Sequence, residues 1–112
     1  MGKNAPIKWH TANIKLSQLK EYPDNPRKIS KEMLEKLVAH IREDGYHQRI
    51  IVDSDYTIIG GHQRKKALYM AGYDDDSEIE VLMSNKKLTP KEIDRLNIRD
   101  NLAFGEYDFE VL

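Results

Sequence analysis

Residues 50–72 read IIVDSDYTIIGGHQRKKALYMAG, which predicts a strand, a turn, a second strand and a helix in direct succession. The segments 50–52 and 56–59 are rich in residues that favour strands, and the short polar stretch between them predicts a hairpin turn. Apolar residues within 62–71 suit a helix, which a following glycine ends. Gly60 and Gly61 therefore form the elbow between the second strand and the helix, because glycine allows a tight change of direction.

This elbow has the features of an anion site. The first backbone N–H groups of a helix have no partner within the helix, and the helix dipole adds a partial positive charge at the same end. Two glycines let a phosphate approach the backbone, and Arg64, which we expect to be exposed, can offer a guanidinium fork beside Lys65 and Lys66. The alternative is a tight turn followed by cations that solvate an exposed helix face, and the spacing alone does not separate the two interpretations.

The residues before this stretch predict edge strands, a loop and a helix. Alternation of apolar and polar residues in 7–20 predicts one or two short edge strands, and the prolines and the Asp-Asn pair in 22–27 predict a rigid loop. Ser30 can cap a helix that runs to about Asp44, because apolar residues recur on one face and Gly45 follows as a stop.

The residues after it predict a loop, a strand and a last helix. Acidic residues within 74–78 predict a solvated loop before a strand at 79–83. Thr89-Pro90-Lys91-Glu92 has the pattern of a helix start with a capping box, and the helix should run to about Ala103. Because periods of two and 3.6 residues alternate along the chain, we expect an α/β (α+β) fold, a small mixed sheet packed by helices near 31–44, 62–71 and 90–103.

Length and composition indicate one cytoplasmic domain. The 112 residues suffice for one hydrophobic core, so we take 1–112 as a single domain. The chain ends on Val111-Leu112 without a helix breaker, and we expect a natural protein that continues beyond this C-terminus. No stretch approaches the roughly 18 apolar residues of a membrane span and no secretory signal is present, so we expect a cytoplasmic location and no membrane partner.

The number of cysteines and the net charge exclude or weaken several classes of function. The chain has no cysteine, which excludes disulfides, cysteine–zinc sites and thiol catalysis. Its net charge of −1 gives no support to strong nonspecific binding of nucleic acid, which would have to come from a local patch.

The order of several short motifs resembles the ParB/sulfiredoxin superfamily, over roughly residues 14 to 112. These motifs are Asn25-Pro26-Arg27 before a helix, the segment 45–50 (GYHQRI) before a strand, the elbow segment 59–67 (IGGHQRKKA) and Asp100-Asn101-Leu102. ParB-type N-terminal domains typically have Gly-Glu-Arg-Arg-x-Arg-Ala at the elbow, which Gly61, Arg64 and Ala67 match while Lys66 keeps the positive charge. The version Gly-His-x-Arg is closer still to Gly61-His62-Gln63-Arg64, and it is found in ParB-like domains of phage and mobile-element proteins, often joined to DNA methyltransferases.

The resemblance implies a ParB/sulfiredoxin-like fold and a site for a nucleoside triphosphate, CTP or ATP, with Mg²⁺ as its companion ion. The elbow box would cradle the triphosphate. The nucleotide-binding and phosphate-binding residues that the resemblance implies are Asn25, Arg27, Gln48, Gly60, Gly61, His62, Gln63, Arg64, Lys66 and Asn101. DNA and a fused or associated DNA methyltransferase are the further partners that it implies.

Several positions depart from the family pattern. His62 stands where ParB proteins have an acidic residue near the magnesium ion, which argues against CTP hydrolysis by the familiar arrangement. Sulfiredoxins have their catalytic cysteine at this position, so the absence of cysteine excludes their activity. Arg49 replaces the proline of a Gln-Pro pair, and Phe104 replaces the arginine of Glu-Asn-x-x-Arg. Centromere recognition cannot be carried over from the resemblance, because the helix-turn-helix and dimerisation regions of ParB are not among these 112 residues.

Other groups of residues give weaker signals. The four histidines, at positions 10, 40, 47 and 62, have no regular metal spacing, and we predict no bound structural metal. Trp9 and Tyr46 could stack on a base, although isolated aromatic residues at the edges of elements more often belong to the core. Three cations, Arg27, Lys28 and Arg49, could join Arg64 in one basic patch, or they could be scattered solvated charges.

Three functions remain open on this sequence. The first is a nucleotide-binding module, regulatory or DNA-associated, in a phage or mobile-element DNA-modification or partition system. The second is a ParB-like nuclease or NTP hydrolase, for which His62 and Asp100 are the catalytic candidates and give thin support. The third is a DNA-binding module without a ligand, to which the near-neutral charge is a mild objection.

Overall fold

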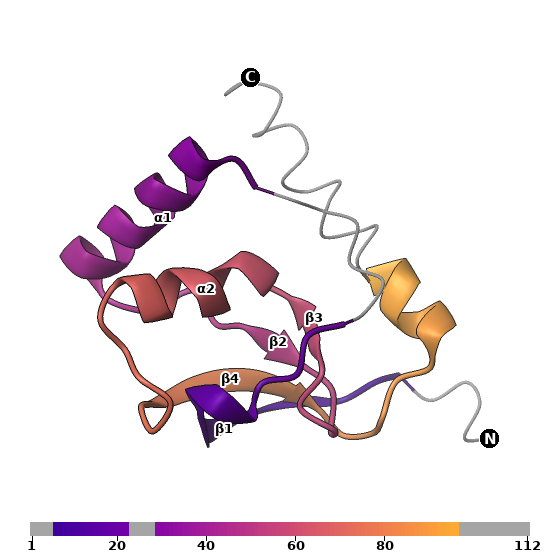
Figure 1. The fold of residues 1–112 in the computed structure, drawn as a ribbon. Coiled ribbons are helices and arrows are strands. Elements are labelled where there is room, and N and C mark those ends of the chain that lie inside the picture. Colours follow the sequence, from indigo (N-terminus) through magenta and orange to yellow (C-terminus); the bar gives the residue numbers. More distant parts are fainter. Residues whose placement is uncertain (1–5, 23–28, 97–112) are drawn as a thin grey trace.

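The computed structural model describes residues 6–22 and 29–96, which form one mixed sheet with helices packed against it (Figure 1). This confirms the predicted α/β fold. The segments 23–28 and 97–112, with part of the predicted loop and of the last helix, lie outside the described residues. The elements are the strands β1 (Trp9–Lys15), β2 (Ile51–Val52), β3 (Ile58–Gly60) and β4 (Glu78–Ser84), the helices α1 (Lys31–Asp44) and α2 (His62–Met70), the 3-10 turn η2 (Leu16–Gln18), and helical residues at 90–96.

The four strands lie in the order β1-β4-β2-β3. β2 and β3 pair antiparallel, which confirms the predicted hairpin, while β4 lies parallel to β2 and antiparallel to β1. The sequence predicted one or two edge strands within 7–20. The structure has one, β1, at the edge of the sheet, and the 3-10 turn η2 follows it. Because Ile51 pairs with Gly60, the sheet places the elbow beside the start of β2.

Local sequence accounts for the boundaries of α1. The hydroxyl of Ser30 accepts a hydrogen bond from the N–H of Met33 at 3.1 Å, as the predicted cap requires. Gly45 ends the helix at a φ of 80°, a left-handed value that favours glycine. The helix is therefore fixed at both ends, and its C-terminal end points the chain into the segment that leads to β2.

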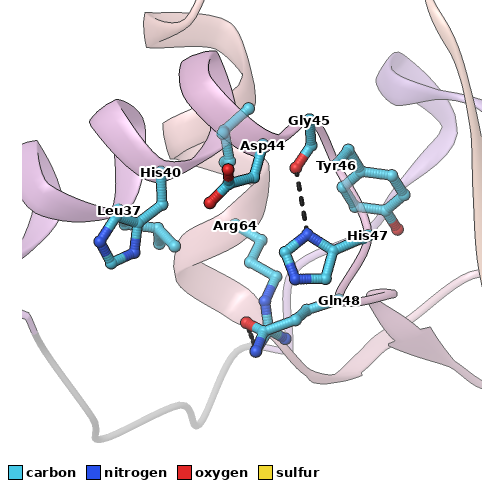
Figure 2. A pocket seen from close by; sticks show the side chains of 9 residues that line it. Leu37, His40, Asp44, Gly45, Tyr46, His47, Gln48 and Arg64 are labelled. Atoms are coloured by element: carbon cyan, nitrogen blue, oxygen red, sulfur yellow. Dashed lines mark hydrogen bonds between the residues drawn. The ribbon is translucent and has the colours of Figure 1, made fainter.

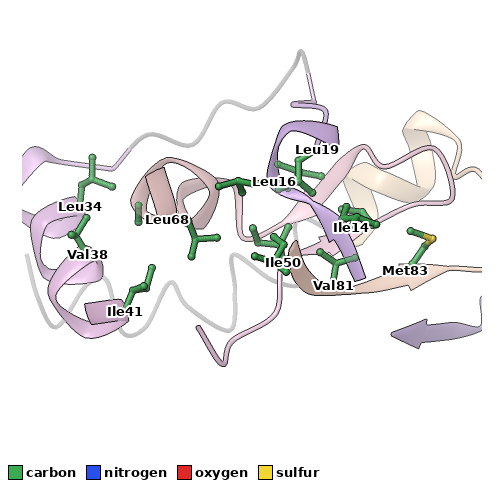
Figure 3. Close-up of a cluster of buried hydrophobic side chains, with 14 residues drawn as sticks. Ile14, Leu16, Leu19, Leu34, Val38, Ile41, Ile50, Leu68, Val81 and Met83 are labelled. Carbon is green, nitrogen blue, oxygen red and sulfur yellow. The ribbon is translucent and has the colours of Figure 1, made fainter. Parts of the chain in front are cut away.

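Two apolar clusters pack on the two faces of the sheet. Ile58 belongs to the larger cluster and Ile59 to the smaller one, and successive strand residues point to opposite faces. The smaller cluster joins Ile59 to Leu88 and Ile93, so the helical residues 90–96 pack on the face opposite α1 and α2. The larger cluster packs α1 and α2 against the sheet and includes Ile14, Leu16, Leu19, Leu34, Val38, Ile41, Ile50, Val52, Leu68 and Val81 (Figure 3).

A buried carboxylate closes the turn between β2 and β3. Asp53 is 1% exposed, and its Oδ1 accepts from the N–H groups of Asp55 at 2.9 Å and Thr57 at 3.1 Å. Its Oδ2 accepts from the N–H of Leu88 at 3.4 Å. Asp53 thus ties the hairpin turn to the segment that precedes the helical residues 90–96.

We expect Asp53→Asn to lower the free energy of unfolding by about 1–2 kcal/mol, because the amide oxygen still accepts at the turn but the amide nitrogen leaves the N–H of Leu88 without an acceptor. Chemical denaturation measures this loss. The matched control is Asp55→Asn, since Asp55 pairs with Lys20 at 3.2 Å on the exposed surface and such a pair contributes at most about 1 kcal/mol. Equal losses in the two variants would contradict the role given to Asp53.

The predicted capping box forms at the start of the last helix. The N–H of Glu92 donates to the hydroxyl oxygen of Thr89 at 3.2 Å, and Glu92 Oε1 accepts from the N–H of Thr89 at 2.9 Å. Lys86 Nζ lies 2.9 Å from Glu92 Oε2. The backbone hydrogen bond from Thr89, followed by the one from Lys86, lowers the pKa of Glu92 from 4.5 to about 2.

A lowered carboxylate pKa means that the folded state favours the ionised form. The stabilisation from Glu92 should therefore be complete above pH 4.5 and be lost as the pH falls through about 2. We expect Glu92→Gln to show a smaller decline in stability than wild type over this interval, measured by denaturant unfolding at several pH values. An identical acid profile in the two proteins would show that Glu92 does not titrate in this way.

Candidate functional site

The elbow between β3 and α2 has the geometry that the glycine pair predicts. β3 ends at Gly60, and Gly61 occupies the N-cap of α2 in a left-handed conformation with φ 81° and ψ 30°. Glycine has no side chain to cap the helix, and the carbonyl oxygen of Gly61 accepts from the N–H of Arg64 at 3.0 Å. Buried Ala67 and Leu68 anchor α2 to the core. The positive end of the helix dipole therefore lies at a fixed elbow where no cap side chain covers the backbone.

Gly61 also makes room for the side chain of Arg64. A Cβ added at position 61 would lie 2.5 Å from Arg64 Nη1 and 3.4 Å from the Cα of Ile50. The first distance is too short for any real contact, so a larger residue would displace the guanidinium. Gly61 is thus required twice, by its backbone conformation and by the position of Arg64.

Arg64 lies beside a pocket of about 200 Å³ at the C-terminal end of α1 (Figure 2). Its Nη2 donates to Oε1 of Gln48 at 3.2 Å, which joins the first turn of α2 to the segment between α1 and β2. The expectation that Arg64 is exposed is wrong, because the residue is only partly exposed. Contact with Gln48 and the close approach of Gly61 hold the side chain along the wall of the pocket instead of in solvent. The pocket is lined by Leu37, His40, Ile41, Asp44, Gly45, Tyr46, His47, Gln48 and Arg64.

The side of this pocket that α1 and the residues after it form was not predicted from the sequence. His40 and Asp44 come from the last turns of α1, and His47 follows Gly45 with its Nδ1 3.3 Å from the Gly45 carbonyl oxygen (Figure 2). A signal was present, because His40 and Asp44 are four residues apart on one helix face and lie next to the segment that holds Gln48. Only the packing of α1 beside the start of α2 shows that this face turns towards the elbow.

Of the three cations that could join Arg64 in one basic patch, Arg49 lies among the described residues, while Arg27 and Lys28 lie outside them, so the patch stays a prediction. Arg49 Nη2 lies 2.5 Å from Glu80 Oε1, so its charge is already paired. Lys65 Nζ donates to the carbonyl oxygen of Leu19 at 3.3 Å, which directs this side chain to the segment after β1 and away from the elbow. Lys66 is exposed on α2. In this structure the Lys65 ammonium therefore points away from the elbow, and its role as a phosphate ligand stays a prediction.

The structure brings part of the predicted site together. Gly60, Gly61, His62, Gln63 and Arg64 form the elbow and the first turn of α2, and Gln48 reaches them from the segment before β2. The predicted residues Asn25, Arg27 and Asn101 lie outside the described residues, as do Lys28 and the catalytic candidate Asp100. The proposed His62–Asp100 pair therefore remains a prediction.

The two aromatic candidates for base stacking are part of the packing. Trp9 packs against the smaller apolar cluster and Tyr46 against the larger one. The Tyr46 hydroxyl donates to the carbonyl oxygen of Glu80 at 2.6 Å and accepts from the N–H of Ile50 at 2.9 Å. Burial is the main reason that the pKa of Tyr46 is raised. Both residues thus fit the interpretation as core residues.

Over 6–22 and 29–96, no three or more His, Asp or Glu side chains are grouped so that they could hold a metal ion. In the same residues, no helix has the length and apolar character needed to cross a membrane.

A family model described as the ParB N-terminal domain matches residues 3–99. The structure resembles the chromosome-partitioning protein ParB from Caulobacter crescentus complexed with CTP-γ-S, with a TM-score of 0.72 and 26% identity over 84% of this chain. The chain spans about half of that ParB chain, which is C-terminally truncated: 53% of its length. A Pnob8-like ParB-N domain shares the fold at 20% identity and a TM-score of 0.67, over 82% of this chain and 36% of that one.

The same Caulobacter crescentus protein complexed to the centromeric parS site also matches, with a TM-score of 0.54 and 28% identity, over 81% of this chain and 48% of that one. No curated protein sequence matches the chain significantly.

Proposed function

This chain belongs to the ParB N-terminal domain family, and from that premise we propose that it binds a nucleoside triphosphate, with CTP as the first choice, at the elbow between β3 and α2. The observation that carries the proposal is the constellation of Gly61, Arg64 and Gln48 at the start of a helix beside a pocket. A similar ParB complexed with CTP-γ-S supports CTP as the nucleotide.

The residues present fit a triphosphate. Arg64 supplies a planar fork for phosphate oxygens, and Gln48 holds one arm of that fork at 3.2 Å. The guanidinium of Arg64 lies over Gly61, where a Cβ would otherwise be, so a phosphate at the elbow would meet this guanidinium, and the dipole of α2 favours negative charge there. The pocket of about 200 Å³ is smaller than the roughly 300–1,000 Å³ of most ligand sites, so it accommodates part of a nucleotide and leaves the phosphates at the elbow.

Magnesium would accompany the triphosphate and neutralise part of its charge. Mg²⁺ is usually held by phosphate oxygens together with one or two carboxylates. Among the described residues, Asp44 is the carboxylate that lines the pocket, whereas position 62 carries a histidine. The ion would therefore depend mainly on the nucleotide, which favours binding over hydrolysis.

We propose further that nucleotide binding regulates an activity on DNA. The support is the similarity, at 28% identity, to a ParB complexed to the parS site. The Gly-His-x-Arg elbow favours a phage or mobile-element setting, in a DNA-modification or partition system, with a DNA methyltransferase as a fused or associated partner. A cytoplasmic location follows from that setting.

The test is a calorimetric screen of the chain against CTP, ATP, GTP and UTP with Mg²⁺, run beside a DNA-cleavage assay under the same conditions. We expect binding of a triphosphate, CTP or ATP, with no cleavage of DNA. Cleavage that depends on magnesium and is lost in His62→Ala would favour the nuclease alternative. The absence of binding to all four nucleotides would refute the proposed function.

A further inference from the structure

The parallel pairing of β2 with β4 is interrupted at one hydrogen bond. Ile51 pairs with Leu82 and Val52 with Met83, and the N–H of Leu82 donates to the carbonyl oxygen of Ile50 at 3.0 Å. In a regular parallel ladder, each second residue of a strand makes two hydrogen bonds to the neighbouring strand. Its carbonyl oxygen accepts from the N–H of one residue there, and its N–H donates to the carbonyl oxygen of the residue two positions earlier on that neighbouring strand. The next bond would therefore run from the N–H of Ile50 to the carbonyl oxygen of Glu80.

The hydroxyl of Tyr46 occupies this place in the ladder. The N–H of Ile50 donates to Tyr46 Oη at 2.9 Å, and Tyr46 Oη donates to the carbonyl oxygen of Glu80 at 2.6 Å. One hydroxyl thus links the two backbones where a direct bond would join them. A tyrosine hydroxyl is protonated at neutral pH, and burial raises the pKa of Tyr46 further, so this hydroxyl can donate and accept at once.

This insertion determines where the segment between α1 and β2 leaves the sheet. Tyr46 is connected through its hydroxyl to Ile50, so the chain between them forms a loop closed at both ends. Gln48 lies in the middle of that loop and reaches Arg64 at 3.2 Å. A further attachment of the loop joins Arg49 Nε and Nη2 to Glu80 Oε1, and solvent screens this ion pair because the two side chains are 48% and 43% exposed.

We propose that Tyr46 is a positioning residue for the phosphate site. Its hydroxyl is inserted between the backbones of Ile50 and Glu80 and so fixes the loop 46–50, in which Gln48 contacts Arg64. Loss of the hydroxyl removes the bridge, so the loop shifts and the guanidinium of Arg64 loses its fixed direction. The positioning of Gln48 and Arg64 by Tyr46 is a property of the free protein. The effect of this positioning on nucleotide binding rests on the proposed function.

The test compares Tyr46→Phe with Gln48→Ala, the double variant and the control Tyr69→Phe. The control is matched, because the Tyr69 hydroxyl also donates a hydrogen bond, to Asp75 Oδ1 at 2.7 Å, but lies towards the other end of α2. In ¹H–¹⁵N spectra of the free protein, we expect the Arg64 Nε–H resonance to move in Tyr46→Phe and in Gln48→Ala and to stay in place in Tyr69→Phe. Loss of the resonance in Arg64→Lys assigns it.

Calorimetry with CTP-γ-S then measures the consequence for binding. Tyr46→Phe should weaken binding about three- to tenfold, the effect of one neutral hydrogen bond, and the double variant should lose no more than the weaker-binding single variant. Losses that multiply in the double variant would show that Tyr46 does not act through Gln48, and would overturn the inference.

Failure of this inference and failure of the proposed function give different results. If wild type does not bind nucleotide, the proposed function fails, while the Arg64 resonance still decides whether Tyr46 positions the side chain. An unchanged Arg64 resonance in a folded Tyr46→Phe overturns the inference whatever binds. Should Tyr46→Phe not fold, nuclear Overhauser contacts in wild type decide, because the inference requires the Tyr46 hydroxyl proton to lie beside the Ile50 amide proton.

Discussion

Gly61→Val is expected to abolish triphosphate binding while the protein stays folded. Valine would bring a Cβ to 2.5 Å from Arg64 Nη1 and drive the guanidinium from its place beside Gln48. The backbone at position 61 has a φ of 81°, which a β-branched residue adopts at a cost of about 1–3 kcal/mol. A domain of ordinary stability survives this loss, whereas the site loses several contacts together.

The matched control for this variant is Gly72→Val. Gly72 has a φ of 109°, so valine is strained there too, but no atom lies within 4 Å of an added Cβ. The melting temperatures of both variants should fall by similar amounts. Only Gly61→Val should lose nucleotide binding in a titration. If Gly61→Val melts cooperatively and binds like wild type, the glycine pair is only a turn and the phosphate cradle is wrong.

Arg64→Ala is expected to weaken triphosphate binding at least about tenfold. A charge-assisted hydrogen bond contributes roughly 1.5–3 kcal/mol, and about 1.4 kcal/mol corresponds to a tenfold change in affinity. The fold should persist, because the guanidinium bonds to Gln48 at the pocket wall while Ala67 and Leu68 hold α2 in the core. Isothermal titration calorimetry with CTP measures the change.

Arg42→Ala serves as the control for loss of a positive charge. Arg42 lies in the last turn of α1 and donates to the carbonyl oxygen of Met70 at 2.9 Å, outside the pocket lining. We expect its affinity to stay within about twofold of wild type, since exposed charges are screened by salt. Equal losses in both variants would show that net charge, and not the geometry of Arg64, governs binding.

The parts of the fold that depend on local sequence were predictable. Ser30 and Gly45 set the bounds of α1, and Thr89 with Glu92 set the start of the last helix, because capping is decided within a few residues. The pairing of β1 with β4 was not predicted, since Trp9 and Ser84 are distant in sequence and no local signal joins them. Such pairings follow from packing of the whole domain.

The same distinction applies to the site. The glycine elbow and Arg64 follow from a strand–glycine–helix pattern that lies within one short stretch. The paths of individual side chains do not, because Lys65 could extend towards the elbow or towards Leu19, and only the tertiary fold places the Leu19 carbonyl within its reach. For the same reason, the walls that His40 and Asp44 contribute became visible only with α1 packed beside α2.

The most direct test of the central claim is a pair of ¹H–¹⁵N titrations of the chain, one with CTP and one with cytidine. A triphosphate held at the start of α2 should shift the backbone amides of Gly61, His62 and Gln63 and the Nε–H of Arg64, and cytidine at the same concentration should leave them unchanged. Equal shifts with both ligands, or shifts confined to residues away from the elbow, would contradict the claim that the elbow binds phosphate.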